Sequence, residues 1–166
     1  MGRLHIREAD PADLDALVGA LGQQRFFADR LRRQDEGLGV LLIAWEDDRP
    51  VGDVYLWLEP AEEAEIRQHL PGVPLLNHLE IHADRQSQGR GTELIRAAER
   101  RLAELGHERV ALAVEVTNEG AAKLYDRLGY REWPHDVVEC YSLTDGVGEL
   151  GIEICRILVK ALTRER

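Results

Sequence analysis

The segment 86–91 holds the residue types that point most directly to ligand binding. Glycines at 89 and 91 allow the backbone to approach a ligand closely, because they carry no Cβ. A helix is expected to begin here, and the unpaired N–H groups of its first turn favour an anion such as a pyrophosphate. Taken alone, the segment fits a ligand-free turn between a strand and a helix equally well. Its residues are Gln86, Ser87, Gln88, Gly89, Arg90 and Gly91.

Two other phosphate-binding loops do not match this segment. The loop that cradles a nucleoside triphosphate requires Gly-Lys followed by Ser or Thr, and this sequence is missing here. The dinucleotide-binding loop requires a third glycine, and Glu93 and Leu94 occupy the positions where that glycine would fall. The sequence therefore disfavours a nucleotide-binding domain of either kind.

A second group of candidate residues lies downstream, on a stretch with helical spacing at 118–128. Asn118 suits the N-cap of that helix, because its side chain can accept a hydrogen bond from the first turn. Tyr125 carries a hydroxyl, a group that can donate a proton in general acid–base chemistry. Tyr125 also lies on the apolar stripe of the helix and would fit core packing.

Together the two groups give the pattern Gln86-x-x-Gly89-x-Gly91, then Asn118-x-x-Ala121-x-x-x-Tyr125-x-x-x-Gly129-Tyr130. This pattern resembles the GNAT superfamily of N-acetyltransferases, most strongly over residues 79–133. The resemblance implies an enzyme that uses acetyl-CoA as co-substrate, needs no metal, and transfers the acetyl group to a primary amine by direct attack. The alternative is a non-catalytic sensor or regulatory domain that binds acyl-CoA. Tyr125 favours catalysis, since a pure binder does not need an acid for a thiolate.

The resemblance also implies roles for individual residues. Tyr125 would be the general acid that protonates the leaving thiolate. The strands that hold Ile81 and Leu112 would splay apart, with the thioester in the gap and a backbone N–H polarising its carbonyl. The implied cofactor-binding residues are Ile81, His82 and Ala83 beside the pantetheine arm, Gln86, Ser87, Gln88, Gly89, Arg90, Gly91 and Thr92 around the pyrophosphate, and Asn118.

The general base has three candidates on or near one expected strand, which are His78, Glu80 and His82. Strict alternation would place all three side chains on one face, but a β-bulge would change that arrangement. Glu80 is the candidate that we carry forward, because it could deprotonate an ammonium directly or through water. Glu80 fits a solvated or salt-bridged strand residue equally well.

The whole chain, residues 1–166, is expected to form one α/β domain with the order β-α-α-β-β-(α)-β-α-β-α-β-β. With the resemblance, this order implies a mixed, mostly antiparallel central sheet flanked by helices, with splayed central parallel strands. A carboxylate-rich stretch at 59–67 is expected to be a short helix. We hypothesise that this helix and Trp57 form part of an acceptor pocket, with the carboxylates Glu59, Glu62, Glu63 and Glu65.

Composition limits the partners. The net charge of -10 disfavours nucleic acid and mildly favours a cationic small-molecule amine. No stretch approaches the roughly 20 apolar residues of a membrane span, and the N-terminus lacks the apolar core of a signal peptide, so we expect a cytoplasmic protein without membrane contact. Cys140 and Cys155 do not form a metal-binding pattern and are interpreted as reduced, buried thiols. The apolar segment 152–159 could pair two copies in a homodimer.

Overall fold

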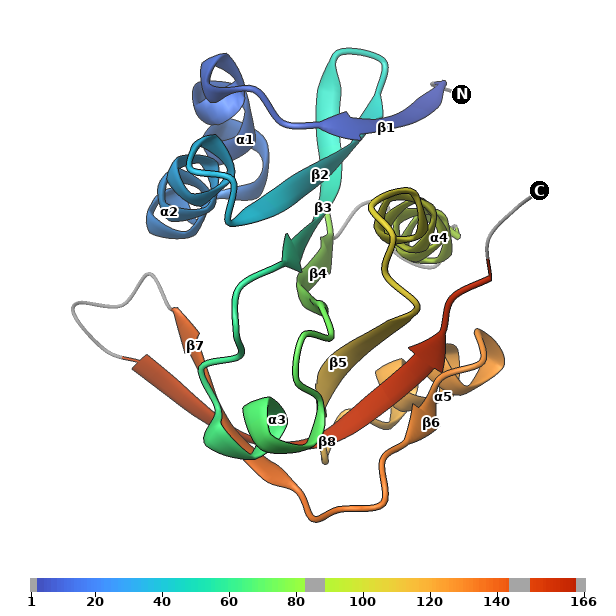
Figure 1. Cartoon of the computed structure of the whole chain (residues 1–166). Helices are drawn as coiled ribbons and strands as arrows, with labels where there is room; N and C mark the ends of the chain where they lie inside the picture. The colour runs from blue at the N-terminus through green and yellow to red at the C-terminus, as the bar shows by residue number, and fades with distance from the viewer. Residues whose placement is uncertain (1–2, 83–88, 144–149, 164–166) are drawn as a thin grey trace.

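The computed structural model describes residues 3–82, 89–143 and 150–163. The described strands form one sheet in the order β1-β2-β3-β4-β5-β8-β6, with β7 paired to β8 (Figure 1). Neighbouring strands in this part of the chain are antiparallel, except for β4 and β5, which are parallel. Helices flank both faces of the sheet, so the predicted fold class is confirmed.

The strands are β1 (Leu4–Glu8), β2 (Gly39–Glu46), β3 (Arg49–Trp57), β4 (Leu75–Ile81), β5 (Arg109–Glu115), β6 (Arg131–Glu132), β7 (Val138–Leu143) and β8 (Leu150–Ala161). The helices are α1 (Leu14–Leu21), α2 (Gln24–Asp35), α3 (Ala64–His69), α4 (Arg90–Glu104) and α5 (Glu119–Arg127), with a 3-10 turn at Pro11–Asp13 before α1.

Strands β2 and β3 separate two apolar cores by the alternation of their side chains. Leu41 and Ile43 of β2 face the core formed with α1 and α2. Leu42 and Ala44, the alternate residues, face the core formed with α4 and α5. Because both faces are covered, the two strands are buried along almost their whole length.

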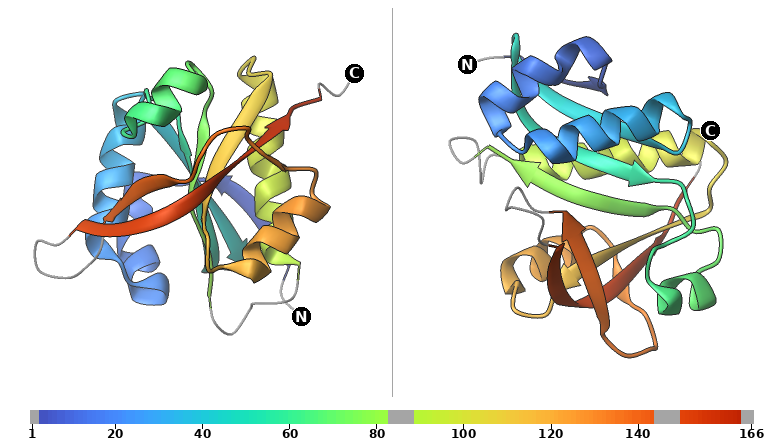
Figure 2. Two further views of the ribbon diagram at one scale, coloured as in Figure 1. Left: turned by 90° about the horizontal axis from the view of Figure 1, so that it is seen from below. Right: turned by 90° about the vertical axis from the view of Figure 1, so that its left-hand side faces the viewer.

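Strands β4 and β5 pair only where they begin. Their backbones are in register at Leu75 with Ala111 and at Leu76 with Leu112, and beyond these residues the strands diverge. Figure 2 shows the separation in the right-hand view. The predicted splaying of the central parallel strands is therefore confirmed, and it opens the sheet on the carboxyl side of both strands.

An extra residue in β4 breaks the strict alternation on which the sequence-based prediction rested. Asp53 of β3 faces Glu80, but Tyr55, two residues later, faces Asn77, three residues earlier on β4. The additional residue forms a β-bulge, and His78 adopts a left-handed backbone with φ of 58°. The side chains of His78 and Glu80 nevertheless approach each other, as described below.

The expected helix at 59–67 begins later than predicted, because α3 starts at Ala64. Glu59 is held in an ion pair with Arg33 of α2 at 2.6 Å. The backbone of Glu63 is still extended, with ψ of 124°. The first half of the carboxylate-rich stretch is therefore an irregular connection anchored to α2.

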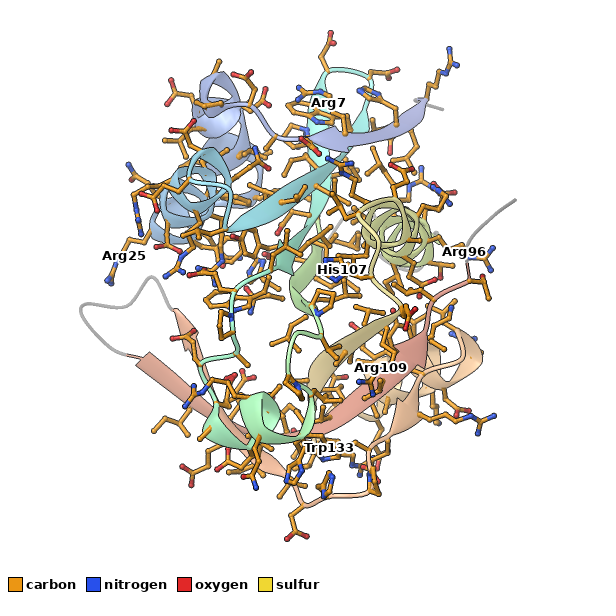
Figure 3. All side chains as sticks on the ribbon, viewed as in Figure 1. Arg7, Arg25, Arg96, His107, Arg109 and Trp133 are labelled. Atoms are coloured by element: carbon orange, nitrogen blue, oxygen red, sulfur yellow. The ribbon has the colours of Figure 1, made fainter. Side chains whose placement is uncertain are left out.

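A third apolar core lies between α3 and the strands β5 and β8. Ile66 of α3 is buried there with Ala111 and Ile157. Trp133, labelled in Figure 3, belongs to the same core, and its indole N–H donates to the carbonyl of Asp136 at 3.1 Å. This core holds the end of the sheet at which β4 and β5 still pair.

Helices α4 and α5 begin where the sequence predicts. Gly89 precedes α4 with φ of 79°, a conformation that favours glycine. The side chain of Asn118 accepts a hydrogen bond from the backbone N–H of Ala121 at 3.1 Å, so Asn118 is the N-cap of α5. None of the helices in the described part of the chain is long and apolar enough to cross a membrane.

Candidate active site

A cleft of about 360 Å³ opens where β4 and β5 diverge. Helix α2 contributes to one side of the cleft, α5 to another, and the β7–β8 hairpin to a third (Figure 1). Its lining residues are Phe26, Arg30, Leu76, Asn77, His78, Leu79, Leu112, Ala113, Val114, Glu115, Asn118, Tyr125, Cys140, Glu153 and Cys155.

Another hollow of about 300 Å³ lies between α4, α5 and the end of β8. Arg96, Arg100, Arg127 and Lys160 line it. Lys160 is paired with Glu99 there at 3.0 Å. Glu99, the carboxylate of this hollow, is engaged by Lys160 and by the hydroxyl of Tyr130, and none of the acid or base candidates from the sequence lines it. Tyr125 and His78, two of the residues predicted from the sequence to act as acid or base, line the cleft between β4 and β5 instead.

Tyr125 of α5 stands on one side of the cleft and is only 9% exposed. Its ring packs edge-on against Tyr130, with 5.7 Å between the ring centroids. The hydroxyl of Tyr130 donates in turn to Glu99 of α4 at 2.7 Å, which ties this part of the cleft to the core. Burial raises the pKa of Tyr125 to about 12, so its hydroxyl keeps its proton at neutral pH.

A cluster of four polar side chains stands beside the cleft at the β-bulge. His78 Nδ1 lies 3.0 Å from Asp53 Oδ1, and His78 Nε2 lies 2.9 Å from Gln23 Oε1. His78 Nε2 also lies 3.3 Å from Glu80 Oε2. The amide of Gln23 donates to the same carboxylate oxygen of Glu80. Strands β3 and β4 and the residue before α2 thus bring four side chains together at one point.

The ionisation of this cluster is set by burial and by its own charges. Asp53 is completely buried, and burial raises its pKa to about 6 in spite of the opposing effect of His78. Burial lowers the pKa of His78, but the hydrogen bond from its ring to Asp53 and the charges of Asp53 and Glu80 outweigh burial and raise the pKa overall. The charged form of His78 and the ionised form of Asp53 therefore stabilise each other.

Sequence reasoning found Glu80 and His78 but missed Asp53 and Gln23. A signal for Asp53 was present, because it is the one charged residue among the apolar residues of the segment 51–58. A buried carboxylate requires a partner, and its isolation in that strand could have marked it as functional. Gln23 gave no such signal, since it reaches the cluster only through the position of α2.

The donor atoms of this cluster are also those that metals prefer. Asp53, His78 and Glu80 each bring a potential ligand atom within 4.8 Å of the others. The expectation of a reaction without a metal therefore stays a prediction.

The expected phosphate-binding segment is described only in part, since Ala83, Gln86, Ser87 and Gln88 lie outside the described residues. Helix α4 starts at the predicted residues Gly89, Arg90, Gly91 and Thr92. Its N-cap is Gly89, so no side chain of the N-cap residue accepts a hydrogen bond from the first turn. A Cβ placed on Gly91 would lie 3.9 Å from Ile81 Cγ1, so the first turn of α4 stands beside the end of β4. The N–H of His82 donates to the carbonyl of Val51 on β3 at 2.7 Å. The N-terminus of α4 and the end of β4 are thus adjacent. The predicted cofactor contacts, with the pantetheine arm beside β4 and the pyrophosphate at α4, require this arrangement.

The acidic stretch does not line the cleft, in contrast to the hypothesis drawn from the sequence. The residues around the cleft include none of the four carboxylates at 59–65, and Trp57 is buried instead in the core under α2. The carboxylates that do line the cleft are Glu115 of β5 and Glu153 of β8. Cys140 and Cys155 are free thiols that line it as well.

The sequence pattern of the acetyltransferase (GNAT) family matches residues 5–130. This chain belongs to that family. The matched range contains β4, β5, the polar cluster and Tyr125, whereas the β7–β8 hairpin lies beyond it. The family pattern therefore covers the side of the cleft formed by β4, β5 and α5, and the hairpin on the other side follows the matched range. No protein with a curated function matches the sequence.

Solved GNAT structures share the fold over almost the whole chain. The ribosomal-protein-S18-alanine N-acetyltransferase from Escherichia coli matches with a TM-score of 0.71 at 18% identity, over 99% of this chain and 97% of that one. The PaiA N-acetyltransferase from Thermoplasma acidophilum, in complex with coenzyme A, has a TM-score of 0.69 at 16% identity, over 96% and 99%. A GNAT acetyltransferase from Elizabethkingia anophelis with acetyl-CoA bound has a TM-score of 0.63 at 14% identity, over 96% and 98%. At such identities the likeness establishes the fold alone.

Proposed function

We propose that this GNAT protein transfers the acetyl group of acetyl-CoA to a primary amine in the cleft between β4 and β5. One observation carries the proposal: Tyr125 and His78 line the same cleft, at the point where the parallel strands separate. The coenzyme A and acetyl-CoA in two of the related structures support the choice of donor.

The residues of the cleft suit direct attack of an amine on a thioester. The amine nitrogen must first lose a proton, and the polar cluster with Glu80 and His78 provides groups that can take it. The C–N bond then forms, the C–S bond breaks, and the sulfur leaves as a thiolate. Tyr125 donates its proton to that sulfur. Burial raises the pKa of Tyr125, and it also disfavours a charged thiolate in the same cleft. The leaving sulfur therefore becomes a stronger base there, which keeps proton transfer from Tyr125 feasible.

The charges around the cleft support a cationic acceptor. Glu115 and Glu153 line it, and Glu80 stands at its edge beside His78. Arg30 is the basic residue of the lining, and its guanidinium is already engaged by Asp29 and by Asn77. The carboxylates of Glu115 and Glu153 therefore favour the entry of an ammonium group into the cleft.

The proposal predicts thiol release from acetyl-CoA that depends on an added primary amine. We expect faster release with amines that carry a second positive charge than with neutral ones. Glu153→Gln should raise the KM of such an amine roughly two- to fivefold and leave the KM of acetyl-CoA unchanged, because an exposed ion pair contributes about 1 kcal/mol or less. Glu65→Gln, the same change on α3 outside the cleft, should alter neither constant. Tight binding of coenzyme A without release for any amine would favour an acyl-CoA sensor instead.

A further inference from the structure

We infer that His78 is the group that takes the proton from the acceptor ammonium, and that the buried carboxylate of Asp53 positions its ring. The inference rests on the proposed function and deepens it. It assigns the proton-accepting step, which the sequence left open among three residues, and it adds a residue that the sequence did not indicate.

The contacts of the His78 ring define which nitrogen can act. An ionised Asp53 only accepts hydrogen bonds, so the hydrogen on His78 Nδ1 points to Asp53 Oδ1 across 3.0 Å. His78 Nε2 faces two oxygens that only accept, Gln23 Oε1 and Glu80 Oε2, so in this arrangement Nε2 carries a hydrogen as well and the ring is a cation. Once that hydrogen is lost, Nε2 is the basic nitrogen of the ring. It is the nitrogen directed at Glu80 and Gln23 rather than at the core. A buried carboxylate that fixes the tautomer of a histidine in this way is a recurrent arrangement in proton transfer.

The backbone is distorted where this cluster forms. His78 and Gln23 both adopt a left-handed conformation, with φ of 58° and 55°. Among the described residues other than glycine, only Asp47 shares this feature, and it lies in the tight turn between β2 and β3. Such conformations are unfavourable for residues other than glycine and persist where the surrounding structure enforces them. Two of them meet here in one hydrogen bond, between His78 and Gln23.

The surroundings leave the ring little freedom. The ring of Phe26 lies against His78, with 3.8 Å between the ring centroids. Asp53 is completely buried, and its second oxygen, Oδ2, has no hydrogen-bond partner in the described part of the chain. A carboxylate is costly in such a position. The free-energy cost of burying this carboxylate is explained if Asp53 serves to orient the His78 ring and to raise its pKa.

Three charged groups on three elements act on His78. Asp53 of β3 and Glu80 of β4 raise its pKa, whereas Arg30 of α2 lowers it. An imidazole is ordinarily a stronger base than a carboxylate by about two pKa units. Transfer of a proton from an ammonium to an imidazole therefore costs less free energy than transfer to a carboxylate. Glu80 is suited to the neighbouring task of binding the ammonium, because it already accepts a hydrogen bond from an N–H group, the amide of Gln23.

The proton balance is simple. His78 Nε2 takes one proton from the ammonium, and the neutral amine attacks the acetyl carbonyl. The C–S bond breaks as the C–N bond forms, and Tyr125 protonates the sulfur. The nitrogen of the new amide loses its second proton to the Tyr125 phenolate, and His78 returns its own to solvent. The sum is an amide, free coenzyme A and one released proton.

The test compares His78→Asn with the wild-type protein in the thiol-release assay. Asparagine tolerates the left-handed backbone but cannot take the proton. We expect kcat/KM for the amine to fall roughly 100- to 10,000-fold, with binding of coenzyme A unchanged. His5→Asn, the same change on the outer strand β1, should leave kcat/KM within a factor of about three. Retention of kcat/KM in His78→Asn would overturn the inference.

Asp53→Asn tests the positioning role through pH dependence. Proton acceptance requires neutral His78, so kcat/KM should rise with pH through the raised pKa of His78. Without the charge of Asp53 that pKa falls, and the rise should move to lower pH while the plateau drops. NMR titration of the His78 ring should show the same shift without reference to activity. An unmoved ring pKa in Asp53→Asn would refute the role of Asp53.

Two further outcomes separate this inference from its alternatives. Loss of wild-type activity in a chelator, restored by Zn²⁺, would overturn it, because His78 would then be a metal ligand among Asp53 and Glu80. A wild-type protein that releases no thiol with any amine would overturn the proposed function, and this inference with it. An active wild type with an equally active His78→Asn would refute only the assignment of the base.

Discussion

Tyr125→Phe is expected to lower kcat for acetyl transfer by roughly 100- to 10,000-fold, the range typical for the loss of a general acid. The phenyl ring preserves the packing against Tyr130 and the shape of the cleft. Only the hydroxyl is lost, and with it the proton for the leaving sulfur. Binding of coenzyme A and the melting temperature should therefore change little. Steady-state kinetics with the best amine, together with a coenzyme A titration, measure these quantities.

Tyr130→Phe is the matched control for this prediction. It removes a hydroxyl from the neighbouring ring, where the group donates to Glu99 and faces away from the chemistry. We expect a loss of about 1 kcal/mol in stability, the ordinary contribution of one hydrogen bond, and a kcat within a factor of about three. Equal losses of kcat in the two variants would indicate that Tyr125 acts through packing, and the assignment of the acid would be withdrawn.

Gly39→Ala is expected to destabilise the fold by about 3 kcal/mol, at the upper end of the usual cost of overpacking. Gly39 begins β2 and is buried against β3. A Cβ at this position would lie 2.0 Å from the hydroxyl oxygen of Tyr55 and 2.6 Å from the carbonyl oxygen of Leu56. Tyr55 is itself fully buried, so neither neighbour can move aside. The melting temperature should fall by roughly 6–12 °C in a thermal unfolding experiment.

Gly19→Ala makes the same chemical change where the structure leaves space. Gly19 lies inside α1, and a Cβ there would meet no atom within 4 Å. Alanine favours a helix over glycine by about 0.5–1 kcal/mol, so this variant should be more stable than the wild type. Two glycine-to-alanine changes of opposite sign would show that packing rather than composition decides the result. A stable Gly39→Ala would contradict the packing of β2 on β3.

The donor half of the site could be predicted from the sequence because its signals are local. The N-cap of Asn118, the position of Tyr125 on α5 and the glycine before α4 all follow from residues within a few positions of one another. The spacing of these elements then carried the resemblance to a family.

The proton-accepting half could not be predicted, because it depends on contacts between distant segments. Asp53 reaches His78 only through the pairing of β3 with β4 and the bulge between them. Gln23 lies 55 residues before His78 and joins it through the packing of α2. Periodicity cannot locate a bulge, and composition cannot identify which carboxylates face a cleft. For that reason the sequence pointed to the acidic stretch at 59–65, whereas Glu115 and Glu153 line the site.

The most direct test of the central claim is a crystal structure with coenzyme A bound. The account predicts that the pantetheine arm enters between β4 and β5, with the pyrophosphate at the N-terminus of α4. The sulfur should then lie within hydrogen-bond reach of the Tyr125 hydroxyl, roughly 3–4 Å, on the side of the cleft facing His78. A sulfur that ends elsewhere, beyond the reach of Tyr125 and away from the polar cluster, would contradict the account.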